Sequence, residues 1–246
     1  MIQRLLELQR DGGRAAVFTV IEGESLGSKL LVVEGAETTG AGPPELADYA
    51  DELIRGGRNQ VLELEGRKVF CEVYGPPPRL FVYGGVDTAQ ALGAAAKLLG
   101  WTTIVADARP KFATRERIPS ADELIVAWPE EAFAKVRPDH ATAIVVLTHD
   151  DKFDLPALEL ALASDAFYIG LIGGRRNQEK KRERLREAGV GEEALGRISG
   201  PCGLDLGADS VPETALSILA EALATRNGRS GGRLRETRLR IHAEAP

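Results

Sequence analysis

Four consecutive residues are of the amino-acid types that commonly bind anions in proteins. Gly173 and Gly174 are followed by Arg175 and Arg176, at the start of a charged helical pattern. Glycine leaves the backbone open, the first turn of a helix offers unpaired N–H groups, and guanidinium groups can donate two parallel hydrogen bonds to a phosphate. On physical grounds this segment is the best predicted anion site of the chain. The alternative is that both arginines only begin a solvated, charged helix.

A second segment has the pattern of a phosphate-binding glycine turn. Gly84 and Gly85 follow an apolar run, and Asp107 comes about twenty residues later, where dinucleotide-binding folds place the carboxylate that bonds a ribose hydroxyl. Val86 and Asp87 depart from the G-x-G-x-x-G pattern, because they put a side chain and a negative charge where a pyrophosphate should lie. The turn predicts a dinucleotide-type fold, and these departures speak against NAD(P) in its usual pose.

Polar residues also follow other apolar runs. His149, between Thr148 and Asp150, is a candidate acid–base group or an orienting donor, or else a histidine bonded within its own turn. Asp107 and Arg109 either contact a ligand or pair with each other as a structural clasp. The catalytic residues are left unassigned, with His149 as the candidate.

The cysteines and histidines show no spacing typical of metal ligands, so no metal site is predicted. Cys202 follows a proline in a glycine-rich loop and is either an accessible thiol or a buried, inert one. Cys71 has apolar neighbours that favour packing. Two distant cysteines argue against a disulfide framework and fit a reducing cytoplasm.

The elements that must position these residues alternate between strand and helix. Continuous apolar runs predict strands buried on both faces of a parallel sheet, at 79–84, 102–109, 123–128, 142–148 and 167–174. Helical patterns separate or follow them at about 87–99, 129–136, 154–164, 175–188 and 212–226. Right-handed crossovers would make this an α/β fold with a Rossmann-like, doubly wound sheet, whose ligands bind beyond the carboxyl ends of the strands at the switch point.

The preceding part of the chain predicts a smaller α+β domain. Helical patterns lie at about 2–10 and 43–57, and β-rich segments lie at 14–23, 28–35 and 60–75, the last a hairpin. The proline run 76–78 is a natural boundary, because proline donates no N–H to a sheet. The predicted domains are 1–75, the Rossmann-like domain 76–228 and an arginine-rich tail 229–246. The tail is either a loosely ordered terminus or a source of arginines for the ligand or an acidic partner.

The composition is that of a globular protein rather than a nucleic-acid or membrane binder. The 246 residues carry a formal net charge of −6, which argues against general binding to polyanions. The first residues form a short amphipathic pattern interrupted by charges, without a signal-peptide core or a membrane span. A cytoplasmic protein is predicted.

Several long motifs occur in order along the chain. They lie at 108–129, 145–162, 168–190 and 200–228, with a closing R-x-x-x-x-R-I-H at 235–242. Together they resemble the XdhC/CoxI family of xanthine dehydrogenase accessory proteins, over roughly 76–242. One branch of that family carries G-A-x-D in place of the glycine fingerprint, and GGVD at 84–87 fits that branch.

The resemblance implies a homodimeric chaperone that binds the molybdenum cofactor, a pterin dithiolene with a phosphate or nucleotide. The partner would be an apo molybdenum hydroxylase of the xanthine dehydrogenase or CO dehydrogenase type, and a sulfurating cysteine desulfurase is a further predicted partner. The positions that match the family's motifs, and are predicted to bind the cofactor, are Gly84, Asp87, Asp107, Arg109, Thr148, His149, Asp150, Gly173, Gly174, Arg175, Arg176, Gly203, Asp205, Gly207 and Glu213, with Gly85 beside them in the turn. The N-terminal part departs from the family, because GESLGSK and GAGPPE stand where G-S-x-P-R and G-G-C-x-E are common.

Two functions therefore follow as hypotheses. The first is a maturation factor that binds and delivers the molybdenum cofactor without turnover of its own. The alternative is an oxidoreductase that uses NAD(P) in the same cleft, with His149 as its acid–base group.

Overall fold

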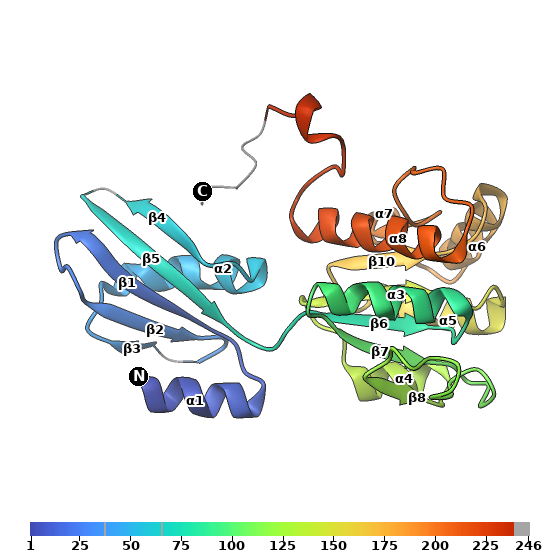
Figure 1. Ribbon diagram of the computed structural model, residues 1–246, viewed down its shortest axis with the longest axis horizontal. Coiled ribbons are helices and arrows are strands. Elements are labelled where there is room, and N and C mark those ends of the chain that lie inside the picture. Colours follow the sequence, from blue (N-terminus) through green and yellow to red (C-terminus); the bar gives the residue numbers. More distant parts are fainter. Residues whose placement is uncertain (37, 65, 239–246) are drawn as a thin grey trace. The chain divides into compact units, whose positions relative to one another are not determined.

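The chain divides into two compact units. The computed structural model describes residues 1–36, 38–64 and 66–238. One unit comprises Met1–Pro76 with the segment that begins at Gly232, and the other comprises Pro77–Gly231 (Figure 1). The division falls within the proline run 76–78. Of the predicted tail, residues 229–238 are described and include the short 3-10 helix η2 (Leu234–Glu236), whereas 239–246 lie outside the described residues.

The first unit is an antiparallel sheet with helices on both faces. The strands β1 (Ala15–Gly23), β2 (Lys29–Val33), β3 (Thr38–Gly40), β4 (Gln60–Leu64) and β5 (Arg67–Tyr74) are arranged in the order β3-β2-β1-β5-β4. Side chains alternate between the two faces along each strand. Phe18 and Cys71 pack against the 3-10 helix η1 (Pro44–Tyr49) and α2 (Ala50–Gly56), and Val17 packs on the other face near α1 (Ile2–Asp11). The predicted helix at 43–57 is thus split into two pieces.

The second unit is built on a six-stranded parallel sheet. Its strands are β6 (Arg79–Tyr83), β7 (Thr102–Ala106), β8 (Glu123–Ile125), β9 (Thr142–Val146), β10 (Tyr168–Leu171) and β11 (Ile198–Ser199). They lie in the order β11-β10-β9-β6-β7-β8, which is the order of a doubly wound dinucleotide-binding sheet. The predicted α/β, Rossmann-like fold is confirmed. The switch point lies between β6 and β9, which are adjacent in the sheet although β7 and β8 separate them in the chain.

Helices cover both faces of this sheet (Figure 1). On one face α3 (Asp87–Leu98) and α8 (Val211–Arg226) pack together, and their apolar side chains meet Leu80 and Val82 of β6. On the other face Phe81 and Tyr83 join the core formed with α4 (Pro129–Val136), α5 (Asp151–Leu162), α6 (Arg175–Glu187) and α7 (Glu192–Gly196). The continuous apolar run of β6 is therefore buried on both sides, as its sequence predicts.

Within the described ranges, the helices lack the combination of length and apolar character that crossing a bilayer requires.

Candidate functional site

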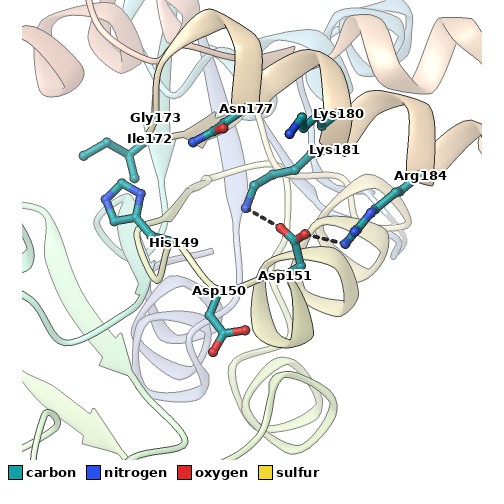
Figure 2. Close-up of a pocket in the computed structure, with 9 residues that line it drawn as sticks. All are labelled: His149, Asp150, Asp151, Ile172, Gly173, Asn177, Lys180, Lys181 and Arg184. Atoms are coloured by element: carbon teal, nitrogen blue, oxygen red, sulfur yellow. Dashed lines mark hydrogen bonds and ion pairs between the residues drawn. The ribbon is translucent and has the colours of Figure 1, made fainter.

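A pocket of about 530 Å³ opens beyond the carboxyl ends of β9 and β10 (Figure 2). One side is formed by the segment that leads into α5, and the other by the beginning and first turns of α6. The lining residues are His149, Asp150, Asp151, Ile172, Gly173, Asn177, Lys180, Lys181 and Arg184. His149, Asp150 and Gly173 are thus brought together as the sequence suggests, whereas the four polar residues of α6 were not predicted.

The carboxylates of the pocket already have cationic or N–H partners. Asp151 forms an ion pair of 3.2 Å with Lys181 and another with Arg184, both drawn in Figure 2. Asp150 caps α5, because its side chain accepts a hydrogen bond of 3.2 Å from the Lys152 N–H, and it lies 3.6 Å from the Lys152 ammonium. The negative charge of both acids is therefore compensated within the protein.

Hydrogen-bond donors at the beginning of α6 have no partner among the described residues and are available to a ligand. No side chain caps this helix, so the N–H groups of Arg175 and Arg176 have no hydrogen-bond partner among the described residues. The side chains of Asn177 and Lys180, which line the pocket, likewise have no hydrogen-bond partner within the described ranges. Gly173 has a φ of 123°, which leaves the backbone open where a side chain would be strained. Exposed helix N–H groups with a nearby ammonium form a site that favours an anion.

His149 projects from a strained turn at the edge of the pocket. Its φ of 58° lies in the left-handed region, which residues other than glycine seldom adopt. The imidazole is solvent-exposed and has no hydrogen bond in the part of the chain that the structure describes, so the alternative of a bond within its own turn is not observed. The turn instead presents the ring at the pocket, where it can donate to a ligand or accept from it.

A buried polar chain lies directly behind the pocket. The Thr148 hydroxyl donates to one oxygen of Asp154, and the Lys181 ammonium donates to the other. All three residues are buried. They join the end of β9 to α5 and α6, so the two walls of the pocket are fixed by one carboxylate. The sequence carried a signal for Lys181, because Gln178, Lys181 and Leu185 follow the spacing of a buried helix face within the charged run.

The glycine turn uses its own polar groups internally. The Gly85 N–H donates to the Asp107 carboxylate at 2.9 Å, and the Val86 N–H donates to the Gly84 carbonyl at 3.0 Å. A Cβ placed on Gly85 would lie 2.5 Å from the Phe112 carbonyl oxygen, so the backbone that follows β7 lies against the turn. Asp87, at the beginning of α3, forms an exposed ion pair of 3.1 Å with Arg117.

Asp107 and Arg109 pair with each other, which is the structural alternative of the two that the sequence offered for them. Asp107 is fully buried, and it accepts hydrogen bonds of 2.9 Å from the Arg109 Nε and N–H groups and of 2.8 Å from Nη2. Burial by itself would raise the pKa of this carboxyl, but the donors of Arg109 and Gly85 outweigh it and lower the pKa. The carboxylate therefore stays ionised and holds the guanidinium in one orientation.

The remaining predicted residues lie outside the pocket lining. Arg175 and Arg176 are exposed, and Gly174 caps α6. The Gly203 N–H donates to Glu221 at 2.8 Å, and Asp205 and Gly207 are exposed in the same loop. Glu213 closes a capping box with Ser210 at the start of α8, and the N–H groups of Asp209 and Ser210 lower the pKa of its carboxyl.

Cys202 does not have the environment of a reactive thiol. Burial, with a smaller contribution from the Glu221 carboxylate, raises its pKa to about 12. Since the thiolate is the nucleophile, this favours the inert alternative. Within the described ranges, no three His, Cys, Asp or Glu side chains are arranged to hold a metal ion.

Comparison with known proteins identifies the family. Residues 80–222 match the XdhC Rossmann domain, which covers more than half of the chain. The chain belongs to the XdhC family. This confirms the resemblance that the sequence motifs indicated. The matched region contains the pocket, the glycine turn, the clasp and the loop that precedes α8.

Curated relatives match over the same part of the chain. An uncharacterized protein of Escherichia coli K12, YqeB, is 33% identical over 167 residues, which are 67% of this chain and 30% of that protein. A probable xanthine dehydrogenase subunit from Bacillus subtilis 168 is 30% identical over 158 residues, or 64% of this chain and 46% of that protein. The molybdenum cofactor insertion chaperone PaoD of Escherichia coli K12 is 29% identical over 151 residues, or 61% and 41%. The chain thus spans less than half the length of each of these relatives.

A solved structure has the same fold. A crystal structure of a xanthine dehydrogenase from Bacillus halodurans superposes with a TM-score of 0.68 at 23% identity, over 92% of this chain and 66% of that one. At this level of identity the likeness concerns the fold.

Proposed function

We propose that this chain is a maturation factor for molybdenum hydroxylases, which binds the molybdenum cofactor and delivers it to an apo-enzyme of the xanthine dehydrogenase or CO dehydrogenase type. Membership of the XdhC family supports this role, as do the names of two relatives, a cofactor insertion chaperone and a probable xanthine dehydrogenase subunit. A second copy of the chain and a cysteine desulfurase remain predicted partners.

The observation that carries the proposal is the anion site at the beginning of α6. The molybdenum cofactor ends in a phosphate or a nucleotide. The pocket offers the side chains of Lys180 and Asn177, the uncapped N–H groups at the start of α6 follow its lining residue Gly173 in the chain, and its acids are already paired. Such a set binds a phosphate group through charge-assisted hydrogen bonds. We therefore assign the phosphate end of the cofactor to this pocket, with His149 at its edge.

The NAD(P) alternative receives less support from the contacts. In the usual pose, a pyrophosphate takes N–H groups of the glycine turn and a ribose hydroxyl takes the carboxylate after the second strand. Here the Gly85 and Val86 N–H groups and the Asp107 carboxylate have internal partners. NAD(P) would have to displace these partners, including a buried carboxylate from its arginine.

The test is a transfer assay with matched charge variants. The full chain, loaded anaerobically with molybdenum cofactor, is mixed with an apo-xanthine dehydrogenase, and recovered hydroxylase activity is measured against free cofactor. Lys180→Glu should weaken cofactor binding by about 1.5–3 kcal/mol, the value of one hydrogen bond to a charged group. Arg176→Glu makes the same charge change on the same helix outside the pocket lining, and it should have the smaller effect.

Two outcomes would contradict the proposal. If the loaded chain restored no more activity than free cofactor, the delivery role would be wrong. If Arg176→Glu abolished cofactor binding and Lys180→Glu left it unchanged, the phosphate would be held by the arginine pair that the sequence predicts and not by the pocket.

A further inference from the structure

Aromatic rings and cations from three segments gather beside the pocket. Two residues follow β7, one follows β8, and two lie in the first turn of α5, after β9. This ring cluster consists of Arg109, Phe112, Trp128, Lys152 and Phe153. It adjoins the pocket, because Asp150 lines the pocket and its carboxylate lies 3.6 Å from the Lys152 ammonium of the cluster. Helix α5 contributes residues to both.

The cluster is organised around the buried ring of Phe153. Trp128 packs on this ring with centroids 5.1 Å apart and planes inclined by 54°. The Arg109 Cζ atom lies 5.6 Å from the Phe153 centroid, and the Lys152 Nζ atom lies 4.6 Å from it. Phe153 is thereby only 3% exposed, whereas Trp128 remains 51% exposed. Packing on Phe153 supports one side of the indole, while much of its surface faces solvent.

Arg109 is held rigidly and keeps spare donors. Its Cζ atom lies 4.0 Å from the Phe112 centroid, and Asp107 fixes its Nε and Nη2 atoms. Nη1 has no hydrogen bond within the described ranges. Arg109 and the half-exposed indole of Trp128 both pack on Phe153. A preorganised guanidinium and an aromatic stacking surface in one cluster are the groups that recognise flat nitrogen heterocycles.

We propose that Trp128 stacks a flat nitrogen heterocycle, a nucleobase or a pterin ring, of the ligand whose phosphate the pocket binds, and that Arg109 donates to the polar edge of that ring. The proposal rests on the function proposed above for the phosphate end and adds the position of the other end. The pocket lies beyond β9 and β10, whereas Arg109 and Trp128 follow β7 and β8, on the other side of the switch point. Doubly wound sheets hold extended nucleotide ligands across this crevice.

Calorimetric titration of the full chain with three probes tests the stacking. The probes are cytidine 5′-diphosphate, 6-hydroxymethylpterin diphosphate and inorganic pyrophosphate, which share a diphosphate and differ in the heterocycle. Stacking of one base on an aromatic residue should tighten binding about 5- to 150-fold over pyrophosphate. Trp128→Ala should abolish this gain, Trp128→Phe should keep most of it, and Leu98→Ala on an exposed surface of α3 should change nothing.

Tryptophan fluorescence gives an independent readout. The chain has two tryptophans, and Trp101 is only 4% exposed, so a stacked base should quench the emission of Trp128 alone. Cytidine 5′-diphosphate should quench the wild-type chain and leave Trp128→Phe unquenched, and pyrophosphate should quench neither.

The outcomes separate this proposal from the function on which it rests. If pyrophosphate bound in a Lys180-dependent way and neither heterocycle improved on it, the stacking site would be wrong and the phosphate site would stand. If a heterocyclic probe bound more tightly but Trp128→Ala kept the gain, the stacking site would also be wrong. A gain for only one heterocycle, lost in Trp128→Ala, would support the site and identify which ring it takes.

Discussion

The ion pair between Lys181 and Asp154 should be the most sensitive point of the pocket wall. Both side chains are almost fully buried, at 8% and 2% exposure, and the Asp154 carboxylate has two partners, the Lys181 ammonium and the Thr148 hydroxyl. Lys181→Met keeps the length of the side chain and removes its charge. Asp154 would then be a buried anion with a single neutral donor.

The size of the effect follows from these contacts. Removing one partner of a buried ion pair costs about 3–5 kcal/mol, because the remaining charge loses its compensation. Asp154→Asn should cost less, about 1–3 kcal/mol. An amide can still bond to Thr148, and Lys181 keeps Asp151 at 3.2 Å. In the double variant no unpaired charge remains at this position, so the two costs should not add, and a coupling energy of about 2 kcal/mol is expected.

Urea unfolding of the four proteins at pH 7, followed by far-ultraviolet circular dichroism, measures the cycle. Lys180→Met is the matched control, since it removes the same group from the preceding residue of α6, which is exposed. It should change the free energy of unfolding by less than about 0.5 kcal/mol. A cost of Lys181→Met no larger than that of Lys180→Met, or additive costs in the double variant, would refute the assignment of a buried pair.

Two further predictions concern groups outside the pocket. Because its partners lower the pKa of Asp107 below 3.8, this carboxylate contributes stability above about pH 4 that is lost as the pH falls through the lowered pKa. Asp107→Asn should therefore reduce the free energy of unfolding at pH 7 by about 1–3 kcal/mol and less below pH 4, whereas Asp205→Asn at an exposed position should show no such trend in urea titrations from pH 3 to 8. The pKa of Cys202 is raised to about 12, so roughly one thiol in ten thousand is ionised at pH 8. Iodoacetamide should therefore alkylate Cys202 far more slowly in the folded chain than in urea. Equal rates in the two states, measured by mass spectrometry, would contradict the raised pKa.

Helix α6 shows why charged residues of one segment have different roles. Arg175 and Arg176 begin the helix and are exposed. Lys180 and Lys181 both line the pocket, but Lys180 is exposed and Lys181 is buried against Asp154. Successive residues of a helix point about 100° apart, so neighbours in the sequence face different surroundings. An argument from charge alone selects the whole run, and only the packing of α6 against α5 determines which of its residues line the pocket.

The sequence by itself determined the architecture of this protein. Apolar runs at 79–84 and 142–148 and helical patterns between the strands are local signals, and periodicity within a short window decides them. The motifs at 145–162 and 168–190 likewise gave the family, because ordered motifs need no knowledge of contacts.

The tertiary structure decided which polar groups are available to a ligand. Asp107 looks like a ribose-binding carboxylate in the sequence, but the fold places Gly85 and Arg109 on it. Lys181 looks solvated within its charged run, but Asp154 from another helix takes it into the interior. Arg109 is a near neighbour of Asp107, but Gly85 is 22 residues from it and Asp154 is 27 residues from Lys181. The burial of these contacts arises only when the sheet and its helices pack together.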